Sequence, residues 1–339
     1  MPTSSTQDAA APGPRLVAIG AGALLVLVLA LLPRVASPYM LTMILPVFAY
    51  AISLLGLNLL FGTSGLLSFG HALFLAIGAY AAAVMTGRWG VSSLELVLLG
   101  GIAAAVVVAI PVGFLSVRYT RIFFGMLTLS FGMLFHSFLI KFYDLTGGDT
   151  GMAVKRVRLV GTDLSHLSRV EFQTGPLYYY ALALVIVATL LMWRIVQSPF
   201  GLHLKAQRDN ARKAEYLGVR VQAFRLAAFV LSAAYGAVAG VLLAVRSGNA
   251  DPELAYWTHS GELVFMTVLG GFSSFAGPLV GAFAFIFLRD WLMGVTEFWR
   301  LAMGGVLVLV VIFVPRGLAG LAADLTARLR SRFDLGSRR

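Results

Sequence analysis

The sequence contains no cysteine and little charge. Only 12% of its 339 residues are charged, whereas soluble domains carry about 25%. Without cysteine the chain has no disulfide, no thiolate nucleophile and no cysteine-ligated metal site. The low charge, with 59% hydrophobic residues and a mean hydropathy of +0.87, excludes an ordinary soluble domain.

Motifs that carry chemistry are also absent. The sequence has no G-x-x-x-x-G-K-[ST] phosphate loop, so this chain does not cradle ATP in that way. Its five histidines are dispersed, and no nucleophile–base or metal-ligand spacing stands out. We therefore expect no catalytic residue, no metal site and no cofactor bound by this chain, which is not an enzyme.

Long apolar runs dominate instead, and several approach the ~20 residues that cross a bilayer as a helix. The predicted fold class is all-α, a polytopic integral membrane bundle of about ten transmembrane helices in one domain, 1–339. The predicted spans are 16–32, 40–61, 66–86, 92–116, 120–141, 176–196, 222–246, 260–274, 277–293 and 298–314.

The first span has some features of a signal peptide. A polar leader, residues 1–15, precedes a 17-residue apolar run, and Ala36 and Ser37 follow it. The run is longer than the usual ~7–15 residues of a signal-peptide core. We therefore expect a retained first helix, and cleavage would leave nine spans.

Lysine and arginine set the orientation. If segment 198–220 is cytoplasmic, 16 of the 26 basic residues lie inside, including those of a basic tail, 315–339. Both termini are then cytoplasmic. The connection 142–175 is external, and a small hairpin, a short surface helix and a plain solvated loop all remain open for it. This bias explains the net charge of +11 without a nucleic-acid partner, in a protein whose surroundings are lipid.

The charged segment 198–220 is the exception in this apolar chain, and its pattern predicts a helix. Ser198 suits the N-cap, Pro199 the first helical position, and Gly218 the residue past the end. A row of mostly small residues forms one face, at Leu204, Gln207, Ala211, Ala214 and Gly218. Such a face fits a groove on another protein better than it fits lipid, although an ordinary charged loop is the alternative.

Three stretches, in order, carry a family resemblance. They are residues 56–80 (GLNLLFG, then LSFGHA and GAY), 208–218 (RDN, AE and a closing glycine) and 262–281 (EL, VLGG, then GP and G). The chain resembles permease subunits of branched-chain amino acid ABC importers over roughly residues 40–290. The external Leu145-Thr146-Gly147-Gly148-Asp149 resembles the longer, LivM type of permease.

The resemblance implies an inward transporter for a small polar solute, most plausibly a branched-chain or other amino acid, in a bacterial cytoplasmic (inner) membrane. The implied partners are two ATPase subunits, a second permease subunit and an external solute-binding protein. The ATPase subunits bind ATP and Mg. The second permease subunit is expected to be a different one, which gives a heterodimer. Transport would follow alternating access, a two-state switch. The alternative is a stand-alone secondary transporter or channel, but the predicted spans contain few of the charged groups that usually couple ions there.

Thirteen residues are candidate site residues on this basis. The coupling candidates, for contact with an ATPase, are Arg208, Asp209, Asn210, Ala214, Glu215 and Gly218. The translocation-path or gate candidates are Asn58, Ser68, His71 and Glu262. The external docking candidates are Gly147, Gly148 and Asp149.

Several of these residues have a plainer structural explanation that we weigh against function. His71 can cap or pack the start of its helix, and Glu262 can be a paired structural carboxylate. Arg289 and Asp290 are explained by snorkelling to the interface. The pairs Gly236-xxx-Gly240 and Gly277-xxx-Gly281 predict close helix packing.

Overall fold

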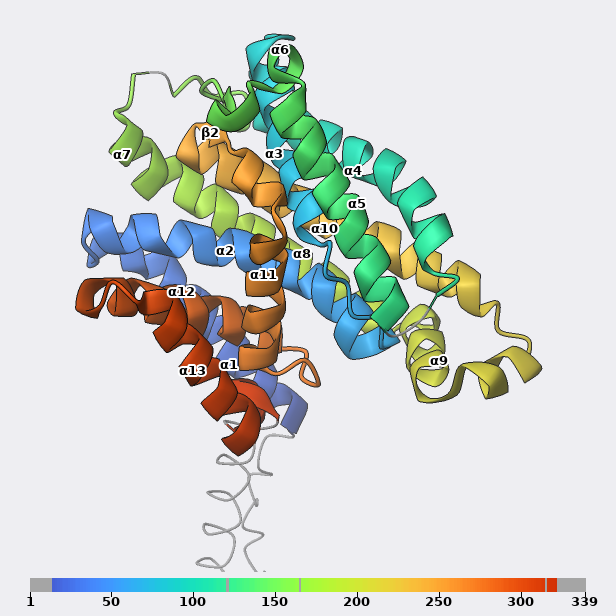
Figure 1. Ribbon diagram of the computed structural model, residues 1–339. Coiled ribbons are helices and arrows are strands. Elements are labelled where there is room, and N and C mark those ends of the chain that lie inside the picture. Colours follow the sequence, from blue (N-terminus) through green and yellow to red (C-terminus); the bar gives the residue numbers. More distant parts are fainter. Residues whose placement is uncertain (1–13, 120–121, 165, 315, 322–339) are drawn as a thin grey trace, which may run out of the picture.

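The computed structural model describes residues 14–119, 122–164, 166–314 and 316–321 (Figure 1). The helices are α1 (Pro14–Leu31), α2 (Pro38–Asn58), α3 (Ala72–Gly87), α4 (Leu94–Ser116), α5 (Ile122–Lys141), α6 (Tyr143–Thr146), α7 (Arg169–Phe172), α8 (Tyr178–Gln197), α9 (Pro199–Tyr216), α10 (Val221–Ser247), α11 (Trp257–Gly270), α12 (Gly277–Val295) and α13 (Trp299–Phe313). Within those ranges the only strands are β1 (Met152–Ala153) and β2 (Asn249–Ala250). The predicted all-α class is confirmed. Most of the predicted leader and most of the basic tail lie outside the described residues.

Six helical stretches are long and apolar enough to cross a membrane. They are Pro38–Ser64, Leu94–Ser116, Ile122–Lys141, Arg169–Gln197, Val221–Ser247 and Gly277–Val295, and three shorter apolar helices are Gly22–Arg34, Ala72–Gly87 and Trp299–Phe313. Each of the ten predicted ranges contains a helix, but the lengths are unequal. α3 begins at Ala72, later than predicted, because residues 65–70 form a non-helical connection that starts with left-handed Gly65.

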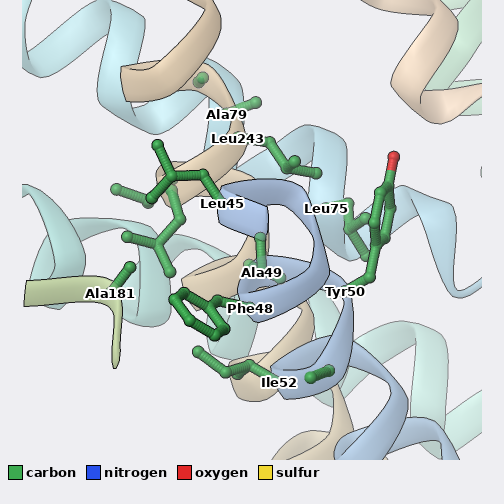
Figure 2. Close-up of a cluster of buried hydrophobic side chains, with 14 of the residues drawn as sticks. Leu45, Phe48, Ala49, Tyr50, Ile52, Leu75, Ala79, Ala181 and Leu243 are labelled. Atoms are coloured by element: carbon green, nitrogen blue, oxygen red, sulfur yellow. The ribbon is translucent and has the colours of Figure 1, made fainter. Parts of the chain in front are cut away.

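α2 is the central helix of the bundle. Figure 2 shows its side chains packed among α3, α8 and α10, in a cluster whose labelled members are Leu45, Phe48, Ala49, Tyr50, Ile52, Leu75, Ala79, Ala181 and Leu243. Almost every residue of α2 from Ile44 onward is buried. A helix that is apolar all round is expected in the middle of a bundle, with neighbours on every side.

Glycine allows the tightest of these contacts. Gly236 and Gly240 of α10 lie against α3, where a Cβ on Gly240 would overlap the backbone of Leu75. Gly277 and Gly281 of α12 lie in the same way against the end of α11. Both pairs therefore serve helix packing, as their spacing predicts.

The peripheral helices turn large apolar side chains outward. The most exposed include Leu99 and Val107 of α4, Phe123 and Leu134 of α5, Leu190 of α8, and Phe283 and Met293 of α12. So many exposed large apolar side chains are uncommon on a soluble monomer. They fit a bundle whose outer surface faces lipid.

The connection 142–175 is folded, and neither a hairpin nor a plain loop describes it. It contains α6, α7 and β1, and β1 pairs antiparallel with the distant β2. Arg88, just beyond α3, donates hydrogen bonds of 2.9 and 2.8 Å to the carbonyl oxygens of Asp144 and Leu145. In Figure 1 this folded connection lies at one end of the bundle and α9 at the other.

Candidate functional site

The predicted helix in segment 198–220 exists as α9, but it is broken. Ser198 is extended before the helix, and Gly218 beyond it has a φ of +85°, so the predicted boundaries are confirmed. Asn210 has φ −156° and ψ 98°, outside the helical region. Its side-chain oxygen accepts a hydrogen bond of 3.0 Å from the backbone N–H of Lys213. Asn210 is thus the N-cap of a second short helical segment, and the prediction of one continuous helix is wrong.

The small-residue face of α9 packs against this chain rather than being free for a partner. Leu204, Gln207 and Ala214 are buried, Ala211 is partly buried, and only Gly218 at the end of this face is exposed. The prediction that this face fits a groove on another protein is therefore wrong. The opposite side, with the exposed Asp209, Asn210, Arg212, Lys213 and Glu215 and the tip residues Tyr216 and Leu217, is the one a partner can reach.

Two side chains of α9 attach it to the end of α2. Gln207 donates to the hydroxyl of Ser64 at 3.3 Å, and Arg208 donates to the carbonyl oxygen of Gly62. Both acceptors lie in the π-helical turn Leu59–Ser64 that ends α2. Gly65 follows with a φ of +75°, and a Cβ there would lie 2.9 Å from Cγ of Arg208, so the absence of a side chain at Gly65 leaves room for the arginine.

Beside this attachment is a cavity of about 370 Å³, between the ends of α2 and α8, α9 and the α11–α12 connection. Its lining residues are Leu55, Asn58, Leu59, Gly62, Thr63, Met192, Val196, Gln197, Lys205, Arg208, Asp209, Phe272, Ser273, Ser274 and Phe275. Asn58 donates to the carbonyl oxygen of Ser274 at 3.3 Å. The rings of Phe61 and Phe272 stack with centroids 4.6 Å apart. The structure thus places one path candidate, Asn58, next to two coupling candidates, Arg208 and Asp209.

The other two candidates from the early motif do not line this cavity. Ser68 and His71 are fully buried just before α3. The ring of His71 meets Phe74 edge-on at 6.0 Å and lies next to Gly236 of α10. The hydroxyl of Ser68 accepts a 3.4 Å hydrogen bond from the N–H of Gly70. Their surroundings are those of packed side chains, and a gating role for either residue stays a prediction.

Glu262 lies at the opposite end of the bundle and lines a cavity of about 250 Å³, which we call the outer cavity after the orientation predicted from the sequence. The lining residues of this cavity are Asp251, Glu253, Leu254, Thr258, His259, Glu262, Arg289, Trp299 and Arg300. Glu262 forms an ion-pair contact of 3.5 Å with His259, one turn earlier on α11. The other ring nitrogen of His259 lies 3.4 Å from the hydroxyl oxygen of the buried Tyr50 on α2. Glu262 therefore has a structural partner and also borders open space.

Interfacial snorkelling was expected to explain Arg289 and Asp290, but both residues have specific surroundings within the bundle. Asp290 accepts a hydrogen bond of 2.9 Å from the hydroxyl of Tyr39 at the start of α2. Arg289 lines the outer cavity, and so does Arg300 at the start of α13. Sequence reasoning did not bring these arginines together with Glu262. In the sequence, the one indication of this cluster was the spacing of His259 and Glu262, which lie three residues apart on one helix.

The external docking candidates have strong structural reasons of their own. Gly147 and Gly148 have φ values of +77° and +57°, and a Cβ on Gly147 would overlap the backbone of Gly151. Of the three candidates, only Asp149 presents an exposed side chain. A docking role for this turn therefore depends on Asp149 and on the backbone shape that the glycines permit.

No group of three or more His, Asp or Glu side chains gathers as a metal site within the described ranges. The polar groups instead form two small sets at the two ends of the bundle, joined by apolar helices.

Comparison with known proteins gives a consistent assignment. Residues 39–314 match the family model described as branched-chain amino acid transport system / permease component. The high-affinity branched-chain amino acid transport system permease protein LivM of Escherichia coli (strain K12) is 30% identical over 286 residues, which are 79% of this chain and 67% of the relative. LivH of the same strain is 23% identical, over 80% of this chain and 91% of the relative. BraD of Pseudomonas aeruginosa is 26% identical over 294 residues, again 80% and 91%. No solved structure matches the chain.

Proposed function

Because this chain belongs to the family of permease components of branched-chain amino acid transport systems, we propose that it carries a small zwitterionic amino acid across the bacterial inner membrane. The chain is a transport subunit and not an enzyme. In this proposal the six long and three shorter apolar helices lie within the membrane together with α11, which makes ten, and both termini are cytoplasmic. LivM, LivH and BraD are named for branched-chain amino acid transport, which makes those amino acids the first solutes to test.

The proposed assembly contains a second permease subunit, two ATPase subunits and an external solute-binding protein. Both the LivM and the LivH relatives match this chain, which favours a pair of different permeases. ATP and Mg would bind on the ATPase subunits, since the sequence of this chain has no phosphate loop. The folded connection 142–175 would then face the binding protein.

The proposal that an ATPase subunit drives transport through α9 rests on one observation. α9 exposes a charged face, and its other face is tied to α2 through Gln207 and Arg208. A force applied to α9 by an ATPase would thus reach the central helix directly, as would a force on the Ser274 connection through Asn58. Because packed helices shift between discrete arrangements and do not bend continuously, such contacts suit an alternating-access switch.

The test uses the natural absence of cysteine. Glu215→Cys places a single thiol on the exposed face of α9, and Ala214→Cys places one on the buried face of the same turn. Each variant is co-expressed with ATPase subunits that carry one cysteine in the surface groove. We expect a nucleotide-sensitive cross-link from position 215 and none from position 214.

Two results would contradict the proposal. One is a thiol at position 215 that reacts with a membrane-impermeant maleimide added outside the cell, since α9 would then be external. The other is a thiol at position 215 that is accessible from inside but never cross-links to any ATPase subunit. The second result would favour a stand-alone transporter.

A further inference from the structure

The outer cavity contains side chains of both charges that do not neutralise one another. Glu262 comes from α11, Arg289 from α12 and Arg300 from α13. Glu262 lies close enough to both arginines for their charges to interact. Yet among the described residues no ion pair within 4 Å joins it to either, and its one such partner is His259.

Opposite charges that border one cavity without contact favour an occupant with both charges. The attraction between a carboxylate and a guanidinium group grows as the distance between them and the polarity of their surroundings fall. Glutamate and arginine side chains are long enough to meet and form an ion pair when nothing lies between them. About 250 Å³ is far more than the ~15 Å³ of probe volume that suffices for one water. The cavity therefore has room for a small solute between the carboxylate and the guanidinium groups.

The carboxylate of Glu262 is held in place from behind. His259 lies between Glu262 and Tyr50, with contacts of 3.5 and 3.4 Å, and the Tyr50 side chain is buried between α2 and its neighbours. This row of three side chains connects the outer cavity to the central helix. A carboxylate fixed by such a network is preorganised for a cation, which lowers the ordering cost of binding.

The rest of the lining is mixed: Asp251, Glu253 and Thr258 are polar, and two apolar residues can contact a short aliphatic side chain. Leu254 and Trp299 contribute apolar surface next to the charged groups. The guanidinium of Arg300 lies over the Trp299 ring, 5.0 Å from its centroid, so one apolar wall and one cationic group adjoin. Small-molecule sites combine such apolar surface with a few placed polar groups.

We propose that the outer cavity is a binding site for the head group of an α-amino acid. Glu262 accepts the ammonium, Arg289 and Arg300 bind the carboxylate, and Leu254 and Trp299 contact the side chain. The inference rests on the proposed function, because transport of a zwitterion is what supplies this ligand. It adds the place on the permease where the solute first binds.

The experiment measures labelling of one cysteine in the cavity. Thr258→Cys puts a thiol on an exposed lining residue of the complete transporter in vesicles. The rate of maleimide labelling is measured with L-leucine, with leucinamide, which lacks the carboxylate, and with 4-methylpentanoate, which lacks the amine. We expect leucine to slow labelling and each analogue to need at least a tenfold higher concentration, since one charge-assisted contact is worth about that factor or more.

Substitutions then assign the two ends of the ligand. Glu262→Gln and Arg289→Gln are each expected to raise the protecting concentration of leucine at least tenfold, with Arg289→Lys milder because it keeps the charge. Glu297→Gln, an exposed glutamate outside the cavity lining, is the matched control and leaves protection unchanged. Val160→Cys, on the exposed external connection, is labelled at the same rate with or without leucine. If Glu262→Gln fails to assemble, Glu262→Asp is used in its place. Aspartate is one methylene shorter, so its carboxylate lies farther from the ligand and leucine is expected to protect less well.

The outcomes separate this site from the proposed function. Leucine uptake without any protection of position 258 would overturn the site and leave the function standing. Equal protection by 4-methylpentanoate and leucine, or unchanged protection in both Glu262 variants, would also overturn it. Uptake of no amino acid by the wild-type complex would contradict the proposed function itself, whatever the labelling shows.

Discussion

The guanidinium of Arg208 donates a hydrogen bond to the carbonyl oxygen of Gly62, which lies 146 residues earlier in the chain. This contact joins α9, whose other side is exposed, to the end of the central helix. The acceptor lies in a π-helical turn, a feature that recurs at functional positions in helices. The contact suggests how movement of α9 is passed on to α2.

Loss of the Arg208–Gly62 hydrogen bond is expected to uncouple ATP hydrolysis from transport. In Arg208→Ala the assembled complex should still hydrolyse ATP, while solute uptake per ATP falls about fivefold or more, because one of the two links to the end of α2 is lost and only the Gln207–Ser64 hydrogen bond remains. Uptake and phosphate release are measured together in proteoliposomes. Arg194→Ala, an exposed arginine on α8 and outside α9, is the control, and equal coupling in the two variants would refute a role for the Gly62 contact.

The break in α9 predicts a specific effect at Asn210. Asn210→Ala removes the acceptor for the N–H of Lys213 and is expected to cost about 1 kcal/mol of local helix stability. The affinity of the ATPase subunit for the permease should fall about fivefold. Asn210→Asp keeps an N-cap acceptor and should bind nearly as the wild type. A pull-down titration in detergent compares the three proteins, and similar affinities for all of them would count against the capped second segment as a contact.

The close packing of α10 on α3 predicts that a larger residue at their contact lowers the stability of the bundle. Gly240→Ala places a Cβ against the backbone of Leu75 and should destabilise the bundle by about 1–3 kcal/mol. Gly304→Ala in α13 is the matched control, because nothing lies within 4 Å of a Cβ there. Thermal unfolding in detergent is expected to shift downward for position 240 alone. Equal melting temperatures would show that the α3–α10 contact has room to adjust.

At the turn formed by residues 147–149, substitutions can separate the effect of backbone shape from the effect of charge. Asp149→Asn is expected to weaken stimulation of ATP hydrolysis by the solute-binding protein about threefold, since an exposed charge at a contact rim contributes modestly. Gly148→Ala should lower the yield of folded protein, because φ is +57° there and alanine disfavours that region. Stimulation is titrated with purified binding protein. No change for Asp149→Asn would remove this turn from the list of docking candidates.

Much of the fold was predictable because its signals are local. Apolar length located the ten helices of the predicted spans, and the glycine spacings in α10 and α12 identified close helix contacts. Ser198, Pro199 and Gly218 gave the ends of α9, since capping depends on a few adjacent residues. The family motifs, confirmed by the match over residues 39–314, identified a transport subunit before any contact was known.

The candidate site was predictable only in its parts. Asn58, Arg208 and Asp209 came from separate motifs, and their meeting at one cavity depends on how α2, α8 and α9 pack. The buried side of α9 was assigned wrongly because the sequence shows that one face has small residues but not what lies against it. The break at Asn210 was missed because asparagine is tolerated within a helix and its capping geometry becomes visible only in the backbone angles.

The sequence by itself thus determined a membrane-embedded helical bundle with a charged helical segment, because hydrophobic length and capping are properties of neighbouring residues, and its family motifs identified a transport subunit. Only the tertiary structure decided that Arg208 reaches Gly62 and that Glu262, Arg289 and Arg300 border one cavity. Those relationships join separate helices, and their distances follow from packing that no single stretch of sequence encodes.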